Sequence, residues 1–215
     1  MTSNKTRQNL IDATERLLRS HGLAHVTTRA IAREAGVAEG SLYHHFSDKA
    51  ELLHAVVQYS MGDFRHALES LPLRVGQYTV RENLEHMLQA AFDFQFKIIP
   101  ITCSLFADHA LLARVREILS KHCIGPARSV EALAAYLQAE QRLGRVAVEI
   151  SAQSAAELLL AGSFHGAMFD QFLARQVGPE AVRLRLHETV RTLLAGLTPR
   201  SPEEAPIPND RKGAS

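Results

Sequence analysis

The sequence predicts an all-α protein with about nine helices. Apolar residues recur at spacings of three and four along almost the whole chain, which is the period of an amphipathic helix. Runs in which apolar and polar residues alternate, as they do in a half-buried strand, are missing. Glycines, prolines and capping residues separate the helical stretches. We therefore expect a compact N-terminal unit of short helices, followed by a larger helical body.

The first three predicted helices are short. An apolar stripe near the N-terminus ends at Gly22, which offers a C-terminal stop. A second helix is expected over residues 28–35, where Gly36 ends it, and a third over about residues 39–46. These three helices make up most of the predicted N-terminal unit.

The fourth predicted helix begins at a capping residue. Either Ser47 or Asp48 can supply the side-chain oxygen of an N-cap. Apolar residues then share one helical face as far as Leu68. We therefore expect one continuous helix over this stretch.

The predicted helices of the body are longer. The first begins with a capping box, in which Thr79 and Glu82 cap one another, and is expected to end at Pro100. The remaining helices are expected over about residues 104–121, 127–142, 151–174 and 180–197.

Composition limits the classes of function. Lys and Arg total 24 against 23 Asp and Glu, so the net charge of +1 excludes a strongly basic nucleic-acid coat and an acidic disordered chain. Two cysteines, Cys103 and Cys123, form no disulfide framework and suit a reducing compartment. The N-terminus lacks the apolar region of a secretory signal, and no apolar stretch approaches the ~18 residues that span a bilayer. A cytoplasmic protein with no membrane partner is expected.

Residues 27–52 carry the pattern of a helix-turn-helix. Two short helices are expected to meet at Gly36, which can adopt the positive φ of a tight turn without a Cβ clash. Small Ala32 allows the helices to cross closely, and Ile31 and Leu42 supply apolar contacts between them. The exposed side of the second helix then presents polar and aromatic groups that suit a DNA major groove, namely Glu39, Ser41, Tyr43, His44 and His45.

The spacing of this stretch resembles the DNA-binding signature of the TetR family of bacterial transcriptional regulators. The matching residues are Thr28, Ile31, Ala32, Ala35, Gly36, Val37, Gly40, Tyr43, Phe46, Lys49 and Leu52. The resemblance covers about residues 5–65, and beyond them only helix number, helix length and total size match. It implies a helix-turn-helix DNA-binding domain at residues 1–50, with the recognition helix at about 39–46. A helical effector-binding and dimerisation domain would follow at residues 51–197.

The remaining residues form a polar C-terminal segment. Residues 198–215 contain four of the eight prolines and almost no large apolar side chain. Such a composition cannot bury a core. We expect a disordered tail.

The resemblance also implies roles for individual residues at DNA. Thr28 is expected to cap the second helix and bind a phosphate there, and Arg29 to reach a guanine or a phosphate. Gly40 would let the recognition helix approach the duplex closely, and Lys49 would bind the DNA backbone. On the recognition helix, further contacts are expected from Ser41, Tyr43, His44 and His45.

Several of these residues have a second interpretation. Phe46 is expected in the core, whereas for Tyr43 core and DNA contact are equally open. The two adjacent histidines could be solvated surface. Glu39 departs from a basic interface, and it either accepts a hydrogen bond from a cytosine N4 amine or points to solvent.

A homodimer through the last two long helices is also implied. These helices carry stripes of small and branched residues that permit close packing. The stripes consist of Ala155, Leu158, Leu159, Gly162 and Gly166, and of Val182, Leu186, Val190, Leu193 and Leu194. A helix buried inside one chain shows the same pattern, so both interpretations stay open.

The central helices are expected to form an effector pocket. Aromatic residues and histidines gather there at helical spacing, which suits a largely apolar ligand but is also typical of plain core. The candidate ligand-binding residues are Met87, Phe92, Phe96, Phe106, His109, Phe164, His165 and Met168.

The predicted function is a ligand-responsive repressor that binds a palindromic operator as a homodimer and is released by a small apolar effector. No cofactor or metal is expected, and the motifs of nucleotide-binding loops, zinc proteases and serine hydrolases are missing. One alternative is a ligand-carrier or interaction protein with a vestigial helix-turn-helix. Another is a metal- or redox-sensing regulator that uses Cys103 and Cys123.

Overall fold

A computed structural model describes residues 2–122 and 125–197, which form ten α-helices and one short 3₁₀ turn. The N-terminal unit consists of α1 (Thr2–His21), η1 (Leu23–His25), α2 (Thr28–Glu34), α3 (Glu39–His45) and α4 (Lys49–Ser60). The body consists of α5 (Gly62–Arg74), α6 (Val80–Leu105), α7 (His109–Lys121), α8 (Pro126–Arg142), α9 (Ala152–Phe172) and α10 (Pro179–Leu197). No strand occurs in these two ranges, and the all-α prediction is confirmed.

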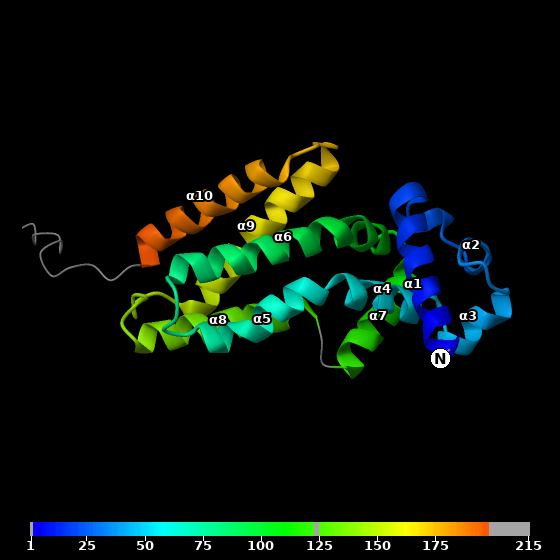
Figure 1. Ribbon diagram of the computed structural model, residues 1–215, viewed down its shortest axis with the longest axis horizontal. Coiled ribbons are helices and arrows are strands. Elements are labelled where there is room, and N and C mark those ends of the chain that lie inside the picture. Colours follow the sequence, from blue (N-terminus) through cyan, green and yellow to red (C-terminus); the bar gives the residue numbers. More distant parts are fainter. Residues whose placement is uncertain (1, 123–124, 198–215) are drawn as a thin grey trace, which may run out of the picture.

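The helices form an elongated molecule with the N-terminal unit at one end (Figure 1). The long helices run side by side along the rest of the molecule, with α6 packed against α5, α9 and α10. Helices α4 and α7 pack together where the two parts meet. None of the helices in the described ranges is both long and apolar enough to cross a membrane. The predicted tail at 198–215 lies outside these ranges.

Two hydrophobic clusters stabilise the two parts separately. The cluster of the N-terminal unit contains Leu10, Ile31, Leu42 and Phe46, together with Ile101 from the far end of α6. A larger cluster fills the body between α5, α6, α8, α9 and α10. Because Ile101 belongs to the first cluster, α6 spans both cores and joins them.

The predicted fourth helix is two helices in the structure. Helix α4 ends at Ser60, and α5 begins at Gly62 after a cap at Met61. The apolar face continues across the break, which explains why the pattern looked continuous. Glycine has low helix propensity, and Gly62 directly follows the break at Met61. This split accounts for the tenth helix.

Pro100 does not end its helix, contrary to the prediction. It lies inside α6, which continues to Leu105, so α7 begins at His109 after an Asp108 cap rather than at residue 104. A proline at this position leaves the carbonyl of Phe96 without its helical N–H partner. The side-chain amide of Gln171 donates to that carbonyl at 2.7 Å. A partner from α9 therefore compensates for the missing bond.

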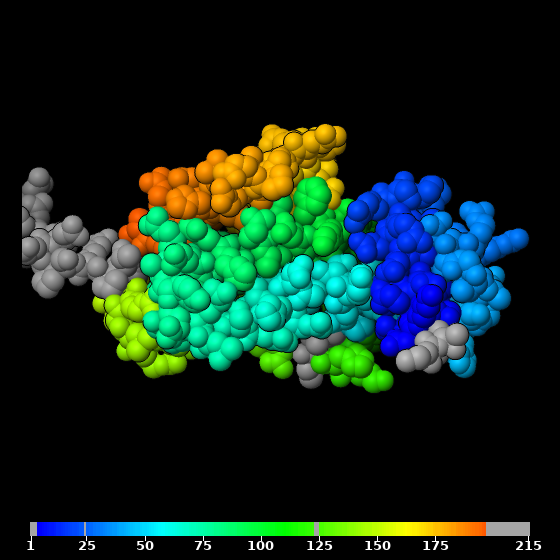
Figure 2. Space-filling view, in the orientation of Figure 1, coloured from blue at the N-terminus to red at the C-terminus, as the bar shows by residue number. Residues whose placement is uncertain are grey.

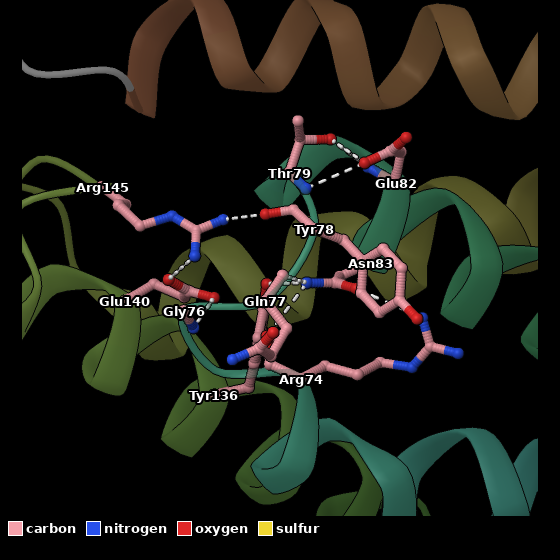
Figure 3. A network of polar contacts seen from close by, with 10 residues as sticks. All are labelled: Arg74, Gly76, Gln77, Tyr78, Thr79, Glu82, Asn83, Tyr136, Glu140 and Arg145. Carbon is pink, nitrogen blue, oxygen red and sulfur yellow. Dashed lines mark hydrogen bonds and ion pairs between the residues drawn. The ribbon is translucent and has the colours of Figure 1, made fainter.

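A polar network around buried Glu140, Asn83 and Tyr136 joins the connection between α5 and α6 to α8 (Figure 3). Glu140 of α8 is fully buried, and its Oε1 accepts from the backbone N–H of Gly76 at 3.3 Å. Its Oε2 lies 3.4 Å from Arg145 Nη1. Asn83 donates to the hydroxyl of Tyr136 at 3.0 Å, and burial raises the pKa of that phenol. The network fixes the α5–α6 connection on α8, and the predicted Thr79–Glu82 capping box starts α6 beside it.

We expect Glu140→Ala to lower the free energy of unfolding by about 2–3 kcal/mol, because the Gly76 N–H loses its acceptor, Arg145 loses its ion-pair partner and a cavity is left at a fully buried position. Urea denaturation followed by circular dichroism measures this change. Glu149→Ala removes an exposed carboxylate and should stay within about 0.5 kcal/mol of wild type. A Glu140 variant as stable as that control would contradict the role of the network.

Candidate nucleic-acid interface and effector site

The turn between α2 and α3 is set by two local features. Thr27 is the N-cap of α2, and its Oγ1 accepts from the backbone N–H of Ala30 at 3.1 Å. Gly36 follows α2 with φ of 68°, a conformation that favours glycine. The prediction that Thr28 is the cap was therefore wrong by one residue. Of two adjacent threonines, the one with extended backbone is the cap, and sequence does not distinguish them.

The inner face of α3 is anchored in the core of the N-terminal unit. Leu42 is fully buried and Phe46 is 2% exposed, so Phe46 is a core residue as expected. Ile31 of α2 lies in the same cluster. The guanidinium of Arg7 covers the ring of Phe46, with its Cζ 5.1 Å from the ring centroid. These contacts fix which side of α3 faces outward.

The outer face of α3 carries a small hydrogen-bonded cluster. Tyr43 is 56% exposed, so it is not a core residue. Its hydroxyl donates to Thr28 Oγ1 at 3.5 Å, and Thr28 donates to Glu39 Oε1 at 2.7 Å. Glu39 therefore binds the start of α2 rather than pointing freely to solvent. The cluster ties the N-terminal ends of α2 and α3 together.

The other predicted contact residues lie around this cluster. Arg29, Gly40 and His44 are exposed, whereas Ser41 and His45 are half-buried. A Cβ added to Gly40 would meet no atom of the chain within 4 Å. No packing within the described residues therefore requires a glycine at this position.

Lys49 is directed toward the protein. It is the first residue of α4 and half-buried, and its Nζ donates to the carbonyl oxygen of Leu23 at 3.4 Å. Burial lowers the pKa of this amine, and the nearby Asp108 carboxylate opposes that shift. Sequence reasoning expected this side chain to point toward DNA, and the contact with Leu23 engages it inside the N-terminal unit instead.

Asp48 joins the N-terminal unit to the body. Its Oδ1 caps α4 by accepting from the backbone N–H of Glu51, and its Oδ2 accepts from Arg114 Nε of α7, both at 2.8 Å. Partial burial opposes ionisation of Asp48, but the bonds from Arg114 and the backbone outweigh it and lower the pKa of the carboxyl. The cap was predicted, but the partner was not, because it lies 66 residues away in sequence.

Four of the eight predicted pocket residues lie in or against the body core, where the rings of Phe92 and Phe96 stack with centroids 6.0 Å apart, and the other four do not join them. Met87 and Phe92 are buried in the body core, and Phe96 and Met168 are half-buried. The others are exposed, and they are Phe106, His109, Phe164 and His165. A cavity of about 700 Å³ lies elsewhere, between α1, α4 and α7, and none of the eight lines it.

The residues predicted at a dimer interface are mostly buried within the chain. The stripe of α10 and the residues Ala155, Leu159 and Gly166 of α9 lie in the core, so the intramolecular interpretation applies to them. Gly166 lies under the guanidinium of Arg185, which pairs with buried Asp170 at 2.6 Å. Other large apolar side chains of the same helices are exposed, namely Leu158, Phe164, Phe169, Phe172 and Leu184.

The cysteine-based alternative concerns Cys103 and Cys123. Cys103 is exposed and free, whereas Cys123 lies outside those ranges. No three metal-binding side chains gather within them. The cysteine-based alternative thus has no assembled site in this part of the chain.

The fold and the α2–α3 face define a helix-turn-helix domain carried on a helical body. Residues 10–56 match the family described as bacterial regulatory proteins of the tetR family. The transcriptional regulator BetI of Pectobacterium atrosepticum is 36% identical over 87 residues, which are 40% of this chain and 45% of that protein. The transcriptional repressor BepR of Brucella suis is 28% identical over 73% of this chain and 76% of its own length.

A solved structure extends the likeness to the body. A putative TetR-family regulator from Mesorhizobium loti superposes with a TM-score of 0.73 at 16% identity, over 92% of this chain and 99% of that one. At such low identity the likeness concerns the fold. The chain spans less than half the length of the curated relatives that it matches first. The match to the tetR family is confined to residues 10–56, which are the helix-turn-helix and the helices on either side of it.

The opposite burial of Tyr43 and Phe46 predicts opposite effects on stability. Phe46→Ala should lower the free energy of unfolding by about 3–5 kcal/mol, because it leaves a cavity in the N-terminal core. Tyr43→Ala should change it by no more than about 0.5 kcal/mol. Urea unfolding curves of both variants measure this difference, and similar losses for the two would contradict the assignment of the faces.

Proposed function

We propose that the protein is a non-enzymatic transcriptional regulator that places α3 in the major groove of operator DNA. The observation on which this proposal rests is the outward face of α3. There Tyr43, Thr28 and Glu39 form one hydrogen-bonded cluster, while the opposite face of the helix is buried in the core. The family of the domain supports the same function. A cytoplasmic location follows from a DNA partner.

Within this proposal, each exposed residue has a chemical role. Tyr43 and Thr28 carry hydroxyls that can donate to a phosphate, and Arg29 can bind a phosphate or a guanine. His44 and His45, together with Ser41, would contact base edges. The open space around Gly40 would admit the DNA backbone. Lys49 would act through the position of α4 rather than by direct contact.

The charge of the region suits specific rather than general binding. Residues 1–49 hold seven Lys or Arg against five acids. Non-specific affinity rests on phosphate neutralisation, so such a modest excess gives weak binding to random DNA. Glu39 adds a carboxylate at the recognition face. This carboxylate disfavours DNA sequences whose base edges offer it no hydrogen-bond donor.

A homodimer would present two recognition helices to a palindromic operator. Two half-sites lie about 34 Å, or one DNA turn, apart, which requires a fixed distance between the two domains. The exposed apolar side chains of α9 and α10 support an interface there. Both helices lie along one edge of the body in Figure 2. Exposed apolar patches of this kind mark interaction sites.

Release by a small-molecule effector completes the proposal. The relative BepR is named a repressor, and we extend this mode of action to the present chain. An effector would act by changing the position of α4, which contacts α1, α5, α6 and α7. The separation of the recognition helices would change with it, and operator affinity would fall.

A gel shift with the DNA upstream of the protein's own gene, repeated across a salt series, tests the DNA partner. We expect tight binding that weakens steeply as salt rises, since counterions are released from phosphates. Tyr43→Ala should bind at least about tenfold more weakly through loss of a phosphate contact. Tyr78→Ala, on an exposed tyrosine of the connection between α5 and α6, is the control.

No binding by wild type at low salt, either to this DNA or to random libraries, would refute the regulator and favour a ligand carrier. Wild-type affinity in Tyr43→Ala would refute the role of that side chain alone.

Leu158→Glu combined with Leu184→Glu should convert the dimer into monomers in sedimentation velocity, because burying two unpaired carboxylates per chain is costly. Leu73→Glu, on a leucine of α5 that is 82% exposed, is the control and should leave the dimer intact. A double variant that still sediments as a dimer would place the interface on another surface.

A further inference from the structure

The cavity between α1, α4 and α7 lies where the N-terminal unit meets the body. Its volume of about 700 Å³ falls within the ~300–1,000 Å³ typical of small-molecule pockets. Helix α1 contributes Arg7, α4 contributes Glu51 and His54, and α7 contributes Arg114 and Lys121. In Figure 1, α7 lies beside α4 on the side of the molecule where α1 begins.

The carboxylates of this cavity are already occupied. Glu51 Oε2 accepts from the backbone N–H of Ser47 at 2.7 Å, and this bond lowers the pKa of the carboxyl. Glu117 accepts from Arg114 Nη1 at 2.8 Å. Arg114 also donates to Asp48, so each of these carboxylates already accepts a hydrogen bond from the protein. The acidic part of the lining offers little to a ligand.

The remaining polar groups are donors. Arg7 stacks on Phe46, but no hydrogen bond from its guanidinium to an acceptor occurs within the described ranges. The same holds for the ammonium group of Lys121 in the last turn of α7. Arg7 also interacts electrostatically with Glu51, but neither cation donates a hydrogen bond within those ranges, so both can donate to an anion. Carboxylates form strong, short hydrogen bonds with such groups.

His54 adds a third unused group. Its Nε2 is buried and has no hydrogen-bond partner among the described residues. The ring stacks on His122, with centroids 6.0 Å apart and planes 13° apart. Burial lowers the pKa of His54, the neighbouring His122 lowers it further, and Glu51 opposes both effects. A neutral imidazole can donate one N–H. A buried nitrogen without a hydrogen-bond partner costs free energy, which a ligand that accepts this bond would recover.

The rest of the lining is apolar. Ile11, Ala55 and Ile118 are buried side chains that reach the cavity from α1, α4 and α7. Tyr59 adds an aromatic ring at the rim. An ion such as phosphate would leave this surface uncovered. The lining suits a molecule with one charged end and one apolar end.

We propose that this cavity binds a small organic acid, whose carboxylate lies between Arg7 and Lys121 and whose aromatic or aliphatic part packs on Ile11, Ala55 and Ile118. His54 donates to a second oxygen of the ligand. That this acid is the effector rests on the proposed function. It differs from the largely apolar effector expected from the aromatic residues of the body.

The position of the cavity gives the ligand a route to DNA binding. Arg7 belongs to the N-terminal unit and Lys121 to the body, so a carboxylate between them connects the two parts. The Asp48–Arg114 pair joins the same two parts beside it. Drawing α1 toward α7 tilts the N-terminal unit on the body. In the proposed dimer this tilt changes the spacing of the recognition helices and weakens operator binding.

Isothermal titration of the full chain with benzoate, 1-naphthoate and octanoate tests the site without DNA. Each acid is compared with its neutral amide, which we expect to bind at least about tenfold more weakly. Arg7→Gln and Lys121→Gln should each lower the affinity for the acids by about tenfold. Arg116→Gln removes an exposed cation of α7 that does not line the cavity and should bind like wild type. Thermal melts confirm that each variant is folded.

Two results would overturn the proposal: no acid binds better than its amide, or Lys121→Gln binds all three acids as wild type does. Lys121 is an exposed residue at a helix end, so this variant stays informative even if Arg7→Gln fails to fold. Gel shifts with and without the acids separate the two hypotheses. Operator binding without acid binding would refute the proposed acid site alone. Acid binding without operator binding would refute the proposed regulator function alone.

Discussion

The bond between Asp48 and Arg114 is the constraint on which the relation of the two parts depends. The hydrophobic clusters of the N-terminal unit and of the body are separate, and the body reaches the first of them only through Ile101, Leu105 and Leu111 of α6 and α7. What joins them is α4, the end of α6 at Ile101, and this ion pair between α4 and α7. Because Asp48 also caps α4, one carboxylate determines both where α4 begins and how it sits on α7. A substitution of Asp48 would therefore alter both the start of α4 and its contact with α7.

Short helices make the recognition face dependent on its core. Helices α2 and α3 have seven residues each, far fewer than an isolated helix needs to be stable in water. Their stability comes from the shared cluster of Ile31, Leu42 and Phe46. The same burial that stabilises α3 also determines its rotation. Tyr43 is exposed because its neighbours Leu42 and Phe46 are buried.

Local constraints were predictable from the sequence, and contacts over long distances were not. The helix-turn-helix was found because its glycine and small and apolar residues lie within 26 positions of one another, each with a local reason. The continuation of α6 through Pro100 depends on Gln171, whose partner carbonyl is 75 residues away in sequence. The periodicity of α9 and α10 predicts burial but not what buries them, so the sequence left core and interface open. The cavity was missed for the same reason, since Arg7, His54 and Lys121 share no sequence pattern.

A ligand can shift an equilibrium only by as much as its affinities for the two states differ. For about a hundredfold release of operator DNA, the acid must bind one arrangement about 2.7 kcal/mol more tightly than the other. A pocket inside the body core would supply that difference by moving several packed helices. A cavity whose two cations belong to different parts supplies it directly, because the distance from Arg7 to Lys121 changes when the N-terminal unit tilts. In this chain the difference in the effector's binding free energy can therefore act at the junction itself, where the Asp48–Arg114 ion pair is the polar contact between the two parts.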